Sequence, residues 1–119
     1  MTFRLLISGA LLITMFSCKN DVQDLSVLPT YTEEGALKAV IEIPAGTSKK
    51  IEYNKKSLSF EVDILDNKER RINFLPYPAN YGFIPSTLCL KAQGGDGDPL
   101  DVIVISETVS SGTQMDVTP

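Results

Sequence analysis

The chain has 119 residues, of which 43% are hydrophobic and 22% charged, which suits one small globular domain and excludes a disordered chain. Its formal charge is −4 and it has no basic tract, which argues against a nucleic-acid partner. It contains no histidine, which excludes a histidine general base, a Ser-His-Asp triad and a histidine-ligated zinc ion.

Residues 1–17 have the pattern of a signal peptide. Arg4 supplies a positive charge, and the apolar run from Leu5 to Phe16 is too short to span a bilayer. The following Ser17-Cys18 pair resembles the cleavage box of bacterial lipoproteins, in which the cysteine is lipid-modified and becomes the new N-terminus. This predicts an exported protein, anchored at Cys18 to a membrane of the bacterial cell envelope. The alternative is an ordinary secretory signal, with an incidental Cys18 and a periplasmic or secreted protein.

Cys89 is the only other cysteine. If Cys18 is acylated, Cys89 has no partner within the chain and is most simply a small buried apolar residue. A Cys18–Cys89 disulfide in an oxidising compartment is the alternative.

Residues 18–38 are expected to hold the anchor cysteine and a polar tether, and residues 39–119 the folded domain. Apolar and β-branched runs, bounded by proline, glycine or asparagine, predict the strands. They are expected at residues 39–43, 49–53, 58–64, 71–75 and 102–105.

Residues 76–85 contain three prolines together with aromatic side chains. A segment so rich in proline is expected to be an ordered loop outside any regular sheet. No helical period of useful length follows the signal peptide. Short strands at this spacing predict a mainly β fold, a small barrel.

The segment from Asp96 to Asp101 places three carboxylates within six residues, at an Asp-Gly and Asp-Pro turn. Carboxylates this close repel one another unless a cation lies among them, and Mg²⁺ prefers such oxygen ligands. Taken alone, the segment is more typical of a solvated acidic turn. The aspartates do not fit an EF-hand calcium loop, whose third acid is followed by the turn glycine, because Asp98 is followed by Pro99.

Four blocks in this order resemble the soluble family I inorganic pyrophosphatases. The blocks are Val40-Ile41-Glu42-Ile43-Pro44, Lys50-Ile51-Glu52-Tyr53, Tyr77-Pro78-Ala79-Asn80-Tyr81-Gly82-Phe83-Ile84-Pro85 and Asp96-Gly97-Asp98-Pro99-Leu100-Asp101. The resemblance implies a small closed β-barrel of the OB-like type.

It also implies a role for each matching residue. Asp96 and Asp101 match metal-binding aspartates, and Glu42 and Glu52 match acids linked to an additional metal. Asp98 matches the aspartate that helps to deprotonate the attacking water, and Tyr81 the tyrosine that hydrogen-bonds near the electrophilic phosphate. The remaining matches are to substrate-binding residues: Lys50, Tyr77 and an arginine, for which Arg71 is chosen over Arg70.

The implied reaction is Mg²⁺-dependent hydrolysis of pyrophosphate to two phosphates. Divalent ions neutralise the phosphoryl oxygens and acidify bound water, and cationic side chains stabilise the leaving phosphate. No nucleophilic side chain is needed. The competing class is a non-catalytic OB-like lipoprotein module that binds metal or phosphate. Independently of that class, each residue has a structural interpretation: Lys50 and Glu52 as a solvated pair, Glu42 as the polar face of an edge strand, and Tyr77 and Tyr81 as core aromatics.

Family members continue with a second aspartate pair, further lysine and tyrosine ligands, closing strands and a C-terminal helix. Residues 39–119 are therefore expected to be the N-terminal part of a longer barrel domain, with another strand starting near Met115. Alone, these residues are expected to fold poorly and to be inactive. The longer parent is expected to be a homo-oligomer.

Overall fold

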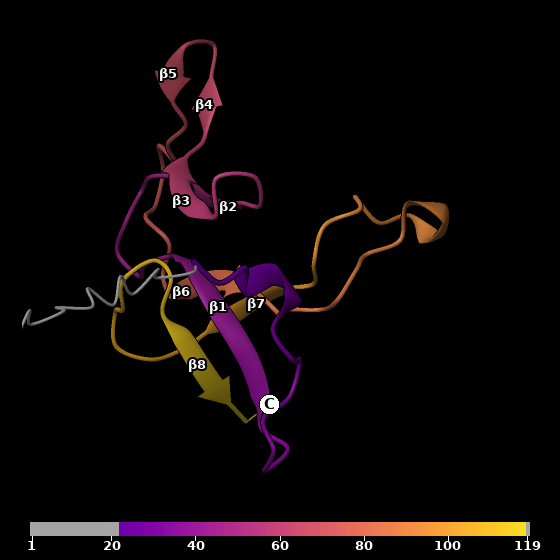
Figure 1. Cartoon of the computed structure of the whole chain (residues 1–119). Coiled ribbons are helices and arrows are strands. Elements are labelled where there is room, and N and C mark those ends of the chain that lie inside the picture. The colour runs from indigo at the N-terminus through magenta and orange to yellow at the C-terminus, as the bar shows by residue number, and fades with distance from the viewer. Residues whose placement is uncertain (1–21, 119) are drawn as a thin grey trace, which may run out of the picture.

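The computed structural model describes residues 22–118, so the predicted signal peptide and Cys18 lie outside the described residues. The fold is mainly β, as predicted, with two short 3-10 turns (Figure 1). No helix among residues 22–118 is long and apolar enough to cross a membrane. The strands are β1 Leu37–Ile43, β2 Ile51–Asn54, β3 Ser59–Val62, β4 Ile64–Leu65, β5 Lys68–Glu69, β6 Asn80–Phe83, β7 Asp101–Val104 and β8 Gln114–Val117, and the turns are η1 Leu25–Val27 and η2 Lys91–Gln93.

The largest sheet has four antiparallel strands in the order β7-β6-β1-β8. Its inner strand β1 is buried on both faces, which explains its nearly continuous apolar sequence. Ala39 and Ile41 pack on one face with Ile84, while Val40 packs on the other with Phe83. Strand β8 confirms the strand expected near Met115.

Strands β2 and β3 form a separate hairpin, and β4 and β5 form another (Figure 1). Asp66 and Asn67 link β4 to β5 with positive φ angles of 52° and 60°, which suit a two-residue hairpin turn. The three sheets do not close into a barrel over residues 22–118, so the described fold is an incomplete OB-like one.

Two strand predictions are corrected. The strand expected over residues 58–64 is divided at Asp63, between β3 and β4. The strand expected over residues 71–75 is absent from the described fold except for one bridge between Lys49 and Arg71. Its apolar side chains point outward, and Phe74 is 97% exposed. The alternation of apolar and polar residues over 71–75 therefore predicted a strand that does not form, because no partner strand of the described fold lies beside this segment.

The prediction that residues 76–85 form only a loop is wrong, because Asn80–Phe83 is an inner strand of the large sheet. The prolines flank β6, so none of them interrupts its ladder. A Cβ at Gly82 would lie 1.9 Å from the carbonyl oxygen of Val40, so only glycine fits beside β1.

Asn80 fixes the start of β6 and is fully buried. Its side-chain oxygen accepts the N–H groups of Ala45 and Val109, at 3.0 and 3.2 Å. Its amide nitrogen donates to the Ser106 hydroxyl and the Glu107 carbonyl, at 3.0 and 2.8 Å. All its hydrogen-bonding capacity is used, so this asparagine joins the end of β1 to the loop before β8.

Residues 22–38 were expected to be a tether, but in the structure they pack on the folded part. Leu28 is only 6% exposed and contacts the core around Val40 and Phe83. Thr30 donates through its hydroxyl to the Pro85 carbonyl at 3.0 Å. Strand β1 also begins earlier than expected, at Leu37.

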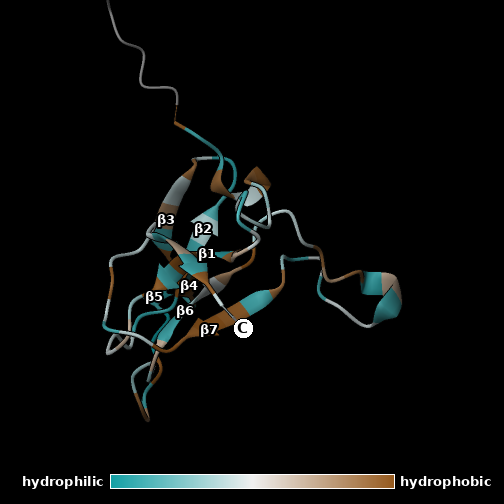
Figure 2. Cartoon of the chain, turned by 90° about the horizontal axis from the view of Figure 1, so that it is seen from below, coloured by the Kyte–Doolittle hydropathy of each residue, from teal (hydrophilic) through white to brown (hydrophobic). Residues whose placement is uncertain are grey.

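Several large apolar side chains remain exposed around β7, where Figure 2 shows hydrophobic colour along the strand. Ile103 is 63% exposed and Ile105, which follows β7, is 92% exposed. The expected core residue Cys89 is half-buried, with a free thiol, in the long loop that carries η2.

Candidate functional site

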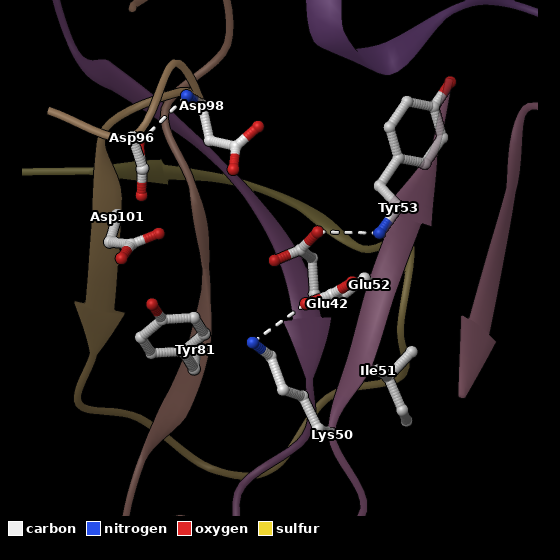
Figure 3. A pocket seen from close by; sticks show the side chains of 9 residues that line it. All are labelled: Glu42, Lys50, Ile51, Glu52, Tyr53, Tyr81, Asp96, Asp98 and Asp101. Atoms are coloured by element: carbon white, nitrogen blue, oxygen red, sulfur yellow. Dashed lines mark hydrogen bonds and ion pairs between the residues drawn. The ribbon is translucent and has the colours of Figure 1, made fainter. Parts of the chain in front are cut away.

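A pocket of about 200 Å³ opens between β1, β2, β6 and the acidic turn that precedes β7 (Figure 3). It combines five carboxylates with a single lysine and one tyrosine hydroxyl near them. Its lining residues are Glu42, Lys50, Ile51, Glu52, Tyr53, Tyr81, Asp96, Asp98 and Asp101. Seven of the sequence-predicted site residues are therefore brought together, from four separate segments.

Glu42 enters the pocket from an irregularity in β1. Ile41 pairs with Gly82 and Ile43 with Tyr81, so Glu42 is an extra residue on its strand. Such a bulge re-aims a side chain locally. One carboxylate oxygen of Glu42 accepts the Tyr53 N–H at 2.7 Å. Burial, helped by the nearby carboxylates of Glu52 and Asp101, raises the Glu42 pKa to about 7.

Lys50 and Glu52 lie at the start of the β2 hairpin, on the same side of the strand. The Lys50 Nζ atom is 2.8 Å from Glu52 Oε1, and the contact is partly solvent-exposed. This hydrogen bond to Glu52 is the main cause that raises the pKa of Lys50, so its ammonium group stays charged at neutral pH.

The acidic turn is held by one hydrogen bond to a side chain and two between main-chain groups. The Asp98 N–H donates to Asp96 Oδ1 at 2.9 Å. The Asp98 carbonyl accepts the Cys89 N–H at 2.8 Å, and the Gly97 N–H donates to the Cys89 carbonyl at 2.9 Å. Because these contacts leave the Asp98 carboxylate unused, it is free to point into the pocket beside the other two aspartates (Figure 3).

Tyr81 projects from β6, with its hydroxyl oxygen directed toward Asp101 (Figure 3). Burial raises the pKa of Tyr81 well above its usual value, and a hydrogen bond to Asp101 adds to the effect. The phenol therefore stays protonated and can donate. Tyr77 does not line the pocket, although its ring centroid lies 5.6 Å from that of Tyr81.

The structure does not place Arg71 in the pocket. Its guanidinium binds Glu69 at 2.6 Å, on the exposed side of the β4–β5 hairpin. Arg70 binds Asp63 at 3.1 Å. Its carbonyl accepts the Lys50 N–H at 2.9 Å, and its charge acts to lower the Lys50 pKa. Arg70 is thus the arginine nearer the site.

Sequence reasoning missed Tyr53 and Ile51 as lining residues, although both belong to the quoted block around Lys50. The contact of the Tyr53 main chain with Glu42 is tertiary and left no signal in the sequence.

Within residues 22–118, no three acidic side chains approach closely enough to hold one ion. The donors are nevertheless carboxylate oxygens, the ligand type that hard divalent cations select.

Residues 39–119 match the family model described as inorganic pyrophosphatase. The chain belongs to the inorganic pyrophosphatase family. Among curated relatives, the inorganic pyrophosphatase of Synechocystis sp. is 39% identical over 84 residues, covering 71% of this chain and 44% of the relative. That of Halalkalibacterium halodurans is 45% identical over 75 residues, covering 61% and 39%.

Solved structures of the family give the same result. The inorganic pyrophosphatase from Thermus thermophilus has a TM-score of 0.61 and 32% identity, over 77% of this chain and 48% of that one. The one from Neisseria gonorrhoeae has a TM-score of 0.59 and 33% identity, over 78% and 49%. The chain thus spans less than half the length of these relatives.

Proposed function

We propose that the longer parent protein of this chain hydrolyses inorganic pyrophosphate to two phosphates with Mg²⁺ as cofactor, and that residues 39–119 alone are inactive. The supporting observation is the pocket itself, in which five carboxylates, Lys50 and Tyr81 meet from segments far apart in the chain. Carboxylates at this density repel one another, and the Glu42 pKa of about 7 reflects that repulsion together with burial. Such a site favours a divalent cation, and with it an anionic phosphate substrate.

Asp96, Asp101, Glu42 and Glu52 would hold the ions. When bound, Mg²⁺ would neutralise phosphoryl oxygens and acidify the attacking water. Asp98 would accept the proton of that water, because its carboxylate faces the pocket and is not used in the turn. Tyr81, held protonated, would exchange its hydrogen bond to Asp101 for one donated to a phosphoryl oxygen.

Substrate binding would rest on Lys50, which can exchange its contact with Glu52 for a phosphate oxygen. Tyr77 would support the ring of Tyr81. Arg70 is better placed than Arg71 to add a second cation beside Lys50. The leaving phosphate gains negative charge as the bond to it breaks. These cationic groups would act by stabilising that charge.

The test is phosphate release from pyrophosphate by the longer parent protein with Mg²⁺, compared with its Asp98→Asn variant. Asparagine keeps the shape of the side chain, and the main-chain contacts of the turn are retained. We expect kcat to fall at least about 100-fold, the range of a lost general base. Asp66→Asn, an exposed change in the β4–β5 turn, is the matched control.

An Asp98→Asn variant with wild-type kcat would remove Asp98 from this role. Saturable Mg²⁺ or phosphate binding by the wild-type parent without any turnover would instead support the non-catalytic module.

We further propose that the protein is exported and anchored through a lipid on Cys18, with a periplasmic or secreted form as the alternative. The support is the Ser17-Cys18 pair behind an apolar run.

A homo-oligomer is also proposed, and light scattering of the purified protein tests it. A monomeric mass at micromolar concentration would contradict it.

A further inference from the structure

The segment of residues 24–28, here called the N-terminal clasp, precedes the residues that match the family model. It joins two parts of the fold. At one end, the Tyr53 hydroxyl donates to Asp24 Oδ1 at 3.0 Å and accepts the Leu25 N–H at 3.1 Å. At the other end, the Leu28 carbonyl accepts the Ser86 hydroxyl at 2.7 Å.

The clasp matters because the pocket lies between two sheets. Lys50 and Glu52 belong to the β2–β3 hairpin, whereas Glu42 and Tyr81 belong to the large sheet. Among the described residues, β2 pairs in a ladder only with β3. No ladder of the described fold therefore joins the two sheets beside the pocket, and the contacts of Tyr53 help to set the spacing across it.

Tyr53 makes the central contact between the sheets. Its N–H holds the Glu42 carboxylate at 2.7 Å, and its ring lies 5.9 Å from the Phe83 ring of the large sheet. Its hydroxyl, at the far end of the ring, is held by the clasp. Figure 3 shows the two ends of Tyr53 directed apart, with the main-chain nitrogen toward Glu42 and the hydroxyl away from the carboxylates.

Asp24 is itself fixed. Its Oδ1 atom also accepts the Ser26 N–H at 2.9 Å and the Ser26 hydroxyl at 2.8 Å. These hydrogen bonds hold the pKa of Asp24 below its usual value, so at neutral pH it is an ionised acceptor.

We propose that Asp24 is a positioning residue of the pocket: by holding the Tyr53 hydroxyl it fixes β2 against β1, and so fixes the Glu42 carboxylate that the Tyr53 N–H carries. The activity readout of this proposal rests on the proposed function. Asp24 does not touch the pocket, and it acts only through Tyr53.

The test compares Asp24→Ala, Asp24→Asn and the control Glu34→Ala, which removes an exposed acid from the same N-terminal region. In Asp24→Ala we expect the Mg²⁺ concentration for half-maximal activity to rise about fivefold, the worth of one side-chain hydrogen bond. The kcat value at saturating Mg²⁺ should stay within about twofold, because the transition-state contacts are unchanged. Asp24→Asn keeps the acceptor oxygen and should restore the wild-type value.

A second readout does not depend on catalysis. Hydrogen exchange at the Tyr53 amide, followed by NMR, should be faster in Asp24→Ala than in Glu34→Ala, because the Tyr53–Glu42 bond opens more often. Tyr53→Phe, which keeps the ring and its packing, should reproduce the Mg²⁺ shift if Asp24→Ala does not fold.

The proposal is overturned if Asp24→Ala changes neither the Mg²⁺ dependence nor the Tyr53 exchange rate, or if Glu34→Ala changes them equally. A wild-type parent protein without pyrophosphate hydrolysis would overturn the proposed function instead, and the exchange rates would then decide the role of Asp24.

Discussion

At the scale of single residues, the ionised Glu42 carboxylate carries an electrostatic cost in the pocket. Its carboxyl is mostly buried, and the two neighbouring acids add repulsion, so its pKa rises to about 7. An acid with a raised folded pKa costs nothing below its unfolded pKa near 4.5. Between that pH and about 7 the unfolded chain ionises first, so the free energy of unfolding falls as the pH rises.

We therefore expect Glu42→Gln to stabilise the metal-free protein at pH 8 and to have little effect at pH 4.5. The glutamine oxygen can still accept the Tyr53 N–H, so the loss of charge is the main change. Urea unfolding with a chelator present, at both pH values, measures the difference. Glu33→Gln, at an exposed position, is the control. The same effect at both pH values would mean that Glu42 titrates normally.

The arginine of the site stays a prediction, because neither Arg70 nor Arg71 lines the pocket. On a continuous strand these neighbouring residues would point to opposite faces. The β4–β5 hairpin interrupts the chain before both arginines, and Glu69 holds Arg71 on the exposed side. The acids, Lys50 and Tyr81 were predictable because each lies within a short block whose order identified the family.

Arg70→Gln should raise the Michaelis constant for pyrophosphate about tenfold, the range for a lost hydrogen bond to a charged group. Arg71→Gln should leave it near the wild-type value, because its recorded partner is Glu69 and not a pocket residue. Steady-state kinetics at saturating Mg²⁺ distinguishes the two. The reverse order of effects would restore Arg71 as the substrate-binding arginine.

At the scale of elements, the sequence predicted β1, β2 and β3 well, because their apolar residues face a core or alternate with polar ones. Strand β6 was not predicted, because the prolines on either side of it favour a loop over the whole of residues 76–85. The sequence does not show which strand will lie beside β6. The roles of Asn80 and Gly82 depend on that neighbour, because both residues contact β1 or the turn that follows it.

Gly82→Ala tests this close approach. The new methyl group would meet the Val40 carbonyl at 1.9 Å, so β6 must move from β1, and we expect a loss of at least about 3 kcal/mol. Gly35→Ala is the matched control: it has open space but a φ of +86°, and should cost about 1 kcal/mol. Urea unfolding ranks the two variants, and equal losses would show that β6 can shift freely.

At the scale of the whole molecule, the clasp limits how far the pocket can lie from Cys18, the proposed anchor. Asp24 holds Tyr53, which lines the pocket, and only residues 19–23 separate Asp24 from Cys18. Cys18 lies outside the described residues, but six fully extended steps reach at most about 22 Å. A lipid on Cys18 would thus keep the site near the membrane surface, where phosphate would be released.

Metabolic labelling with a clickable palmitate analogue tests the anchor in bacterial cells that express the full chain. The wild type and Cys89→Ser should both incorporate label and partition into a detergent phase, because Cys89 lies in the loop near the acidic turn and not at the cleavage box. Cys18→Ser should lose the label, because an oxygen at this position cannot form the thioether to the lipid. A labelled Cys18→Ser variant, or an unlabelled wild type in the aqueous phase, would contradict the anchor. The second result would leave a periplasmic or secreted protein, in which the clasp still holds Tyr53 but the pocket has no fixed distance from a membrane.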